Sequence, residues 1–142
     1  MKINIKRVDK TLPLPEYHTA GAVAFDLYSR LDMEIPAKSL ALIPSNLIIQ
    51  TPDEYMLIIV PRSGTPRKKN LLIPHGIGII DRDYCGPEDE IKMQVYNFSD
   101  QPTHIARGER IGQGVFVRAN QADWQEKDQL PNQNRGGFGS TG

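Results

Sequence analysis

Proline and glycine interrupt this chain throughout its length, and their spacing most restricts the fold that it can adopt. Eleven prolines and twelve glycines are spread over 142 residues, and both residue types disfavour the interior of long helices. The segments between them are short and rich in isoleucine, leucine and valine, a pattern typical of β-strands bounded by turns. We therefore expect an all-β fold, either a sandwich or a barrel.

The clearest strand signals are short apolar or alternating runs. Residues 55–60 are continuously apolar and end at Pro61, which predicts a buried strand, whereas residues 91–96 alternate between apolar and polar side chains. Further strands are expected at residues 40–43, 47–49, 77–80 and 111–116. A chain of this length favours one domain, so we expect a single β body over residues 1–120.

A polar segment follows this body. Residues 121–134 have Trp124 and Leu130 as their only large apolar side chains, so we expect a linker that carries the chain end away from the body. A short helical turn at residues 124–129 is the alternative.

The last eight residues, 135–142, contain four glycines, Arg135 and Phe138. Successive glycines let backbone N–H groups converge on an anion, an arginine binds phosphate, and an aromatic ring stacks on a base. We interpret this end as a lid over a nucleotide. A frayed terminus is the alternative.

The charge balance limits the class of partner. Lysine plus arginine equals aspartate plus glutamate, at 17 each, whereas a general nucleic-acid binder needs a basic excess. The only dense basic run, residues 67–69, is interpreted as a solvated loop. We therefore expect no stable binding to nucleic acid.

The cysteine content and the lack of targeting or membrane-spanning segments indicate the cellular compartment. Cys85 is the only cysteine, which excludes an intrachain disulfide and fits a reducing compartment. Residues 1–6 alternate and lack the apolar region of a signal peptide, and no apolar run approaches the length that crosses a bilayer. We expect a cytoplasmic protein without a membrane partner.

Two strand ends carry polar groups suited to chemistry. Residues 61–64 (Pro-Arg-Ser-Gly) would present a cation, a hydroxyl and bare backbone to an anion, unless Ser63 only bonds its own turn. Residues 76–84 place Asp81 at a strand exit, where a general base would be held firmly. Asp83 shares a face with Asp81 if the strand continues, whereas a turn would separate them. A hairpin with solvated acids is the alternative.

Two further polar residues lie in apolar surroundings. Asp26 follows a run of small residues, and a carboxylate there needs a partner, either an arginine, a hydrated Mg²⁺ ion or a purely structural salt bridge. Gln113 follows a charged turn and is interpreted as a satisfied core amide or as a ligand. The three histidines, His18, His75 and His104, lack metal-ligand spacing.

Taken together and in order, these segments resemble the five motifs of the trimeric dUTPases (dUTP diphosphatases). The motifs look like residues 24–29, 61–64, 78–84, 108–113 and 135–142. The resemblance spans nearly the whole chain. It implies a distorted jelly roll or β-clip-like barrel, assembled as a homotrimer with active sites at the subunit contacts.

The resemblance also implies a reaction. Members of this family hydrolyse dUTP to dUMP and pyrophosphate by attack of water on the α-phosphorus, with Mg²⁺ bound through the triphosphate. The reaction limits uracil incorporation into DNA and supplies dUMP for dTMP synthesis. The implied partners are dUTP and further copies of the same chain.

The roles of individual residues follow from their positions in the motifs. Asp81 would deprotonate the attacking water and touch the 3′-hydroxyl, Tyr84 would pack under the deoxyribose and exclude a 2′-hydroxyl, and Asp26 would act on Mg²⁺ through water. The phosphates or the water would contact Arg62, Ser63, Gly64 and Gln113, and the uracil edge would meet the backbone around His75, Gly76 and Gly78. The lid would contact substrate through Arg135, Phe138, Gly139, Ser140 and Thr141, with the ring of Phe138 stacked on uracil.

The chain departs from the family pattern at several places. The hairpin after Tyr84 is longer, at residues 85–90, and His75 stands where many bacterial members have asparagine. Gln133 occupies the usual place of the arginine in the last motif, which leaves Arg135 as the arginine for the phosphate clamp.

Two other functions fit the same features. A dCTP deaminase of the same superfold, including a bifunctional one, would need a glutamate in the base pocket, for which Glu88 and Glu90 are candidates. The second is a non-catalytic nucleotide-sensing module, against which the presence of both Asp81 and Tyr84 argues.

Overall fold

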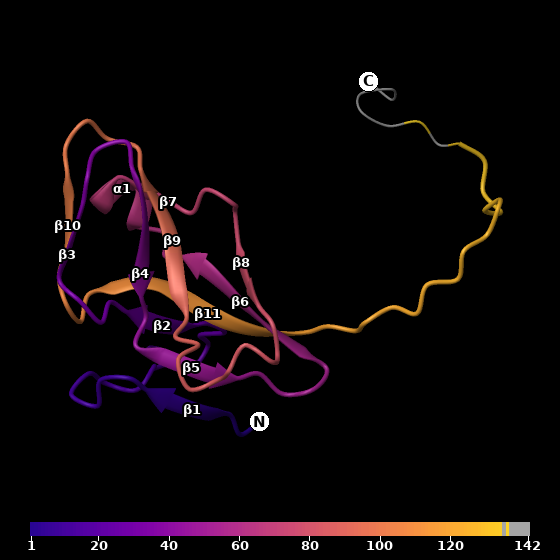
Figure 1. Ribbon diagram of the computed structural model, residues 1–142, viewed down its shortest axis with the longest axis horizontal. Coiled ribbons are helices and arrows are strands. Elements are labelled where there is room, and N and C mark those ends of the chain that lie inside the picture. The colour runs from indigo at the N-terminus through magenta and orange to yellow at the C-terminus, as the bar shows by residue number, and fades with distance from the viewer. Residues whose placement is uncertain (135, 137–142) are drawn as a thin grey trace.

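Short antiparallel strands build most of the chain (Figure 1). The computed structural model describes residues 1–134 and 136. The elements are β1 (Asn4–Arg7), β2 (Phe25–Tyr28), β3 (Met33–Ile35), β4 (Leu40–Pro44), β5 (Leu47–Gln50), β6 (Tyr55–Pro61), α1 (Thr65–Lys69), β7 (Leu71–Leu72), β8 (Gly78–Ile80), β9 (Lys92–Asn97), β10 (Thr103–Ile105) and β11 (Arg110–Arg118). The expected all-β fold is confirmed.

The strands form two main sheets and two ribbons. One sheet has the order β2-β11-β6-β8 and the other the order β4-β9-β7, while β1 pairs with β5 and β3 with β10. The longest strand, β11, is central in its sheet because it pairs with β2 on one side and with β6 on the other. Segments far apart in the sequence therefore meet along β11.

The core lies between these sheets and consists of aliphatic side chains with few aromatic ones. Its fully buried members include Leu27, Ile35, Ile43, Leu57, Ile91 and Val95. On β11, a Cβ atom at Gly114 would lie 2.5 Å from Cζ of Phe25, so only glycine lets β11 approach β2 this closely.

The expectation of a solvated loop at residues 67–69 is wrong, because these residues lie in helix α1. Pro66 occupies the first turn of the helix, where its fixed φ angle favours the helical conformation. Asn70 ends the helix in the left-handed region, with φ of 54°, and its N–H donates to the carbonyl of Pro66. A single helical turn needs no long periodic pattern, so it could not be predicted from periodicity.

The segment after β11 runs away from the sheets in an extended path (Figure 1). Residues 119–134 form neither helix nor strand, so the alternative of a helical turn at residues 124–129 is not adopted. Trp124 and Leu130 are 92% and 77% exposed. Within the described part of the chain, no helix is both long and apolar enough to cross a membrane.

Candidate functional site

Five of the predicted site residues line one cleft of about 470 Å³. These residues are Asp26, Arg62, Ser63, Gly64 and Gln113. The pairing of β11 brings them together, because Gln113 lies opposite Asp26 of β2 on one side and opposite Val60 of β6 on the other. The Gln113 side chain also donates to the carbonyl of Pro61 at 3.3 Å, which ties it to the turn that carries Arg62.

Asp26 is the centre of an ion-pair cluster in this cleft. Its side chain is only 7% exposed and accepts from Nε of Arg62 at 3.0 Å and from Nη1 of Arg110 at 3.2 Å. Nε2 of His18 lies 2.8 Å from its Oδ2 atom. A buried carboxylate requires such partners, and the carboxylate in turn fixes the orientation of Arg62 at the cleft wall.

The cleft carries an excess of positive charge. Five lysine and arginine side chains line it, but only two carboxylates, those of Asp26 and Glu109, do so. Lys69 is neutralised by Glu109 at 2.7 Å. Arg67 and Lys68 are exposed and have no carboxylate within ion-pair distance among the described residues. An open cleft with unpaired cations and hydroxyl groups suits a polyanion such as a chain of phosphates.

The other predicted residues lie on and after β8. Asp81 follows this strand and is exposed, and a turn closes behind it, because the N–H of Tyr84 donates to the carbonyl of Asp81 at 3.3 Å. This turn separates Asp81 from Asp83, so the two carboxylates do not continue one strand face. The Tyr84 hydroxyl donates to the carbonyl of Glu90 at 3.3 Å.

The turn that leads into β8 contains the residues expected to meet a base. Gly76 adopts φ of 82°, in the left-handed region that favours glycine. Gly78 and His75 border a hollow of about 20 Å³ between β8 and β9, which has room for roughly one water molecule. A nucleobase is therefore too large to enter this hollow.

Within one chain the segment from Asp81 to Tyr84 lies at the opposite end of β6 from Arg62. Ile80 pairs with Leu57, so Asp81 continues toward Met56, whereas Arg62 follows the other end of the strand. Six residues of extended strand span roughly 20 Å. In Figure 1, α1 lies near the arrowhead of β6, and the chain after β8 runs to the opposite end. The structure thus separates Asp81 and Tyr84 from the residues of the cleft, whereas the residues that precede β8 lie toward the Arg62 end of β6.

Comparison with known proteins decides the family. The dUTPase family model matches residues 10–142. The chain belongs to the dUTPase family. A deoxyuridine 5′-triphosphate nucleotidohydrolase of Dictyoglomus turgidum is 39% identical over 148 residues, covering 100% of this chain and 99% of the relative. Another, from Wolinella succinogenes, is 37% identical over 144 residues, covering 100% of this chain and 95% of the relative.

Solved dUTPase structures share the fold. A crystal structure of the dUTPase from Streptococcus mutans matches with a TM-score of 0.77 at 31% identity, over 84% of this chain and 98% of that one. The dUTPase of Staphylococcus bacteriophage 80alpha with dUPNHPP matches with a TM-score of 0.87 at 21% identity, over 99% and 98%. The expected dUTPase-like fold is therefore confirmed.

The predicted lid of this dUTPase family member has its expected contact residues outside the described part of the chain. Its substrate contacts were expected at Arg135, Phe138, Gly139, Ser140 and Thr141, and all of them lie outside the described residues. These contacts stay predictions from the motif alone.

Several cleft residues were not expected from the sequence. Arg110 and His18 contact Asp26, and the exposed Arg67 and Lys68 also line the cleft. The basic run at residues 67–69 directly follows the second motif, and this adjacency was the available signal for Arg67 and Lys68. His18 gave no signal, because only the folded chain brings it to Asp26.

Glu90 was a candidate base-pocket residue for the deaminase alternative. Its side chain is 8% exposed and forms two hydrogen bonds of 2.9 Å with the guanidinium of Arg30. It also accepts from the N–H of Asn46 at 2.8 Å. Both carboxylate oxygens are therefore engaged inside the protein.

Proposed function

We propose that this chain hydrolyses dUTP to dUMP and pyrophosphate, by attack of water on the α-phosphorus. Family membership supports the activity, and the single structural observation that carries it is the cleft in which cations outnumber carboxylates. Phosphoryl transfer is largely a matter of alignment and charge neutralisation. Arg62, Ser63, Gly64 and Gln113 offer the cation, hydroxyl and amide groups that such a substrate needs.

We assign the chemical step to Asp81. It is exposed at the end of β8, where a water molecule can reach it, and an ionised carboxylate accepts a proton from attacking water. Tyr84, tied to Asp81 by one turn, would pack under the deoxyribose. The backbone of His75, Gly76 and Gly78 would read the uracil edge.

Magnesium enters this proposal through the substrate. No cluster of three or more histidine, cysteine or acidic side chains that could hold a metal occurs among the described residues. Both oxygens of Asp26 already accept from cations, which leaves it to act on a metal only through water. Mg²⁺ would therefore be held by the phosphates, where it would neutralise part of their charge.

We further propose that the active sites form between subunits of a homotrimer. Support comes from the separation within one chain of Asp81 and Tyr84 from the cleft that contains Arg62. A neighbouring copy that places the turn from its Asp81 to its Tyr84 over this cleft would complete the site. Residues 121–134 would act as the linker and residues 135–142 as the lid over the assembled site.

A subunit-mixing experiment tests this shared site. Asp81→Asn and Arg62→Gln subunits, each expected to be inactive alone, are co-refolded. If sites lie between subunits, random mixing restores about a quarter of the wild-type sites, measured as pyrophosphate release from dUTP. Sites contained within one chain would show no recovery.

A second experiment distinguishes hydrolysis of dUTP from the alternative, deamination of dCTP. Purified protein with Mg²⁺ is given dUTP or dCTP, and pyrophosphate and ammonia are both measured. We expect pyrophosphate from dUTP and no ammonia from dCTP, because Glu90 is engaged with Arg30. Ammonia release from dCTP would contradict the proposed function.

A further prediction concerns the rim of the cleft. Arg67→Gln should raise KM for dUTP by about fivefold, the effect of losing one water-exposed ion pair of about 1 kcal/mol. Salt should reduce the difference. Lys10→Gln removes the same charge from an exposed position that does not line the cleft and should leave KM unchanged. Equal KM values for the two variants would contradict a role of Arg67 in phosphate binding.

A further inference from the structure

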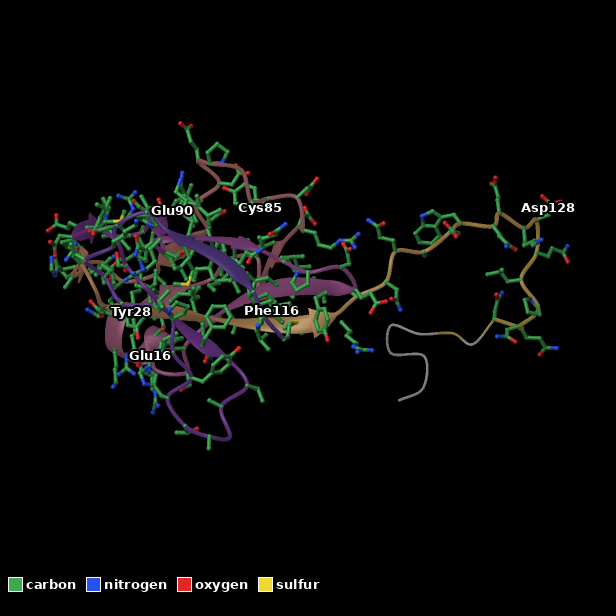
Figure 2. The ribbon with its side chains drawn as sticks, turned by 90° about the horizontal axis from the view of Figure 1, so that it is seen from below. Glu16, Tyr28, Cys85, Glu90, Phe116 and Asp128 are labelled. Atoms are coloured by element: carbon green, nitrogen blue, oxygen red, sulfur yellow. The ribbon has the colours of Figure 1, made fainter. Side chains whose placement is uncertain are left out.

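Glu90 is the most deeply buried acidic residue after Asp26, and the cleft does not account for it. It lies where the long loop after β8 returns to the body (Figure 2). Its carboxylate and the Arg30 guanidinium face each other in a two-bonded arrangement, Nε to Oε1 and Nη2 to Oε2, both at 2.9 Å. The hydrogen bond to Glu90 raises the pKa of Arg30, so the guanidinium stays charged.

The turn between β4 and β5 holds Glu90 from the other side. The N–H of Asn46, a residue with φ of 70°, donates to Oε1 of Glu90 at 2.8 Å. The N–H of Ile91 donates to the carbonyl of Leu47, and that of Ser45 donates to the carbonyl of Ile91, both at 2.9 Å. The end of the loop is thus fixed to a buried part of the body.

The same residue anchors Tyr84. The carbonyl of Glu90 accepts the hydrogen bond from the Tyr84 hydroxyl at 3.3 Å, while Tyr84 as a whole residue is 39% exposed. The loop between them is braced as well, because Lys6 Nζ donates to the carbonyl of Pro87 at 2.9 Å and the N–H of Gly86 donates to Asp89 at 2.7 Å.

We propose that the Arg30–Glu90 ion pair is a positioning element that holds the ring of Tyr84 in the orientation that discriminates deoxyribose from ribose. The inference rests on the proposed function, in which Tyr84 packs under the sugar. It gives the longer hairpin of this chain a role. The loop connects Tyr84 to Glu90, whose carbonyl accepts from the Tyr84 hydroxyl and whose side chain pairs with Arg30.

Replacing both partners of the ion pair distinguishes an effect on the position of Tyr84 from an effect on the stability of the fold. Replacing a buried ion pair by apolar side chains of similar size is often neutral or stabilising, whereas removing one partner is costly. The variant with both Arg30→Met and Glu90→Leu should therefore stay folded. It loses the two hydrogen bonds of the ion pair and the one from the Asn46 N–H, which together orient the residue 90 carbonyl.

The readout is the ratio of kcat/KM for dUTP to kcat/KM for UTP. We expect the double variant and Tyr84→Phe each to lower this ratio by about tenfold, with trimer content and melting temperature close to wild type. Combining the double variant with Tyr84→Phe should add little further loss, because both act on the same hydrogen bond. Additive losses would overturn the proposal.

A chemical probe tests the position of the ring without using activity. The nitration rate of Tyr84 by tetranitromethane, followed by peptide mass spectrometry, should rise in the double variant. Glu90→Gln keeps the shape of the side chain and the acceptor for the Asn46 N–H, so its nitration rate and substrate ratio should lie closer to wild type than those of the double variant. Lys38→Met breaks the exposed Lys38–Asp100 pair and should change neither.

The outcomes separate this inference from the proposed function. Wild-type protein that releases no pyrophosphate from dUTP contradicts the function, while the nitration comparison still decides whether the pair positions Tyr84. Active wild-type protein whose double variant keeps both its substrate ratio and its nitration rate contradicts only the inference.

Discussion

Asp81→Asn should abolish the turnover of dUTP while leaving its binding intact. Asparagine has nearly the shape of aspartate but cannot accept the proton of the attacking water, and loss of a general base lowers kcat by about 10²–10⁴-fold. Asp81 does not line the cleft of its own chain, which contains Arg62 and Ser63, so phosphate binding should persist. Pyrophosphate release gives kcat, and calorimetric titration of the variant with dUTP gives the dissociation constant.

Two further substitutions make this result specific. Asp53→Asn removes a carboxylate that is 99% exposed and pairs only loosely with Arg82, at 3.5 Å, and turnover should stay at the wild-type level. Asp83→Asn tests the other acid of the same turn. If Asp83→Asn abolished turnover and Asp81→Asn did not, the assignment of the base would be wrong.

Local patterns predicted the strands of this fold well. The apolar run at residues 55–60 became β6, and the alternating residues 91–96 became most of β9, because a strand that faces a core imposes its period on the sequence. The very short β7, Leu71–Leu72, and the single turn of α1 could not be predicted in this way. Elements of this length are stabilised by their neighbours, and they have too few residues to show a periodic pattern of apolar side chains.

The site was predictable in its motif residues but not in its long-range pairs. Asp26 was expected to need a cation, yet its partner Arg110 lies 84 positions further along the chain. Only the pairing of β2 with β11 brings the two together. The distance between Asp81 and Arg62 follows from the direction in which β8 pairs with β6. The spacing of the motifs along the sequence does not reveal this direction. The separation of the two halves of the site is therefore a property of the topology.

Asp26→Asn should have the second large effect, and it should weaken both the cleft and the fold. Arg62 and Arg110 lose their shared carboxylate and repel each other, so Arg62 no longer points steadily at the phosphates. A displacement of about 1 Å in a positioning group can cost about 10²-fold in kcat/KM. Because the two arginines are 36% and 42% exposed, water stabilises them partly, and the free energy of unfolding should fall by only about 1–3 kcal/mol. Urea denaturation measures the loss in the free energy of unfolding. Kinetics under conditions well below the unfolding transition measure the loss in kcat/KM.

Glu109→Gln distinguishes positioning from net charge, because it removes the same charge from the same cleft. It releases Lys69, which is bound to Glu109 at 2.7 Å, and the new amide oxygen still accepts from the N–H of Ala106, as Glu109 does at 3.1 Å. If the net charge alone governed phosphate binding, both substitutions would lower KM for dUTP. Positioning predicts opposite results, with KM lower or unchanged in Glu109→Gln and higher in Asp26→Asn. An Asp26→Asn variant that binds dUTP as tightly as Glu109→Gln would show that Asp26 does not orient Arg62 for the substrate.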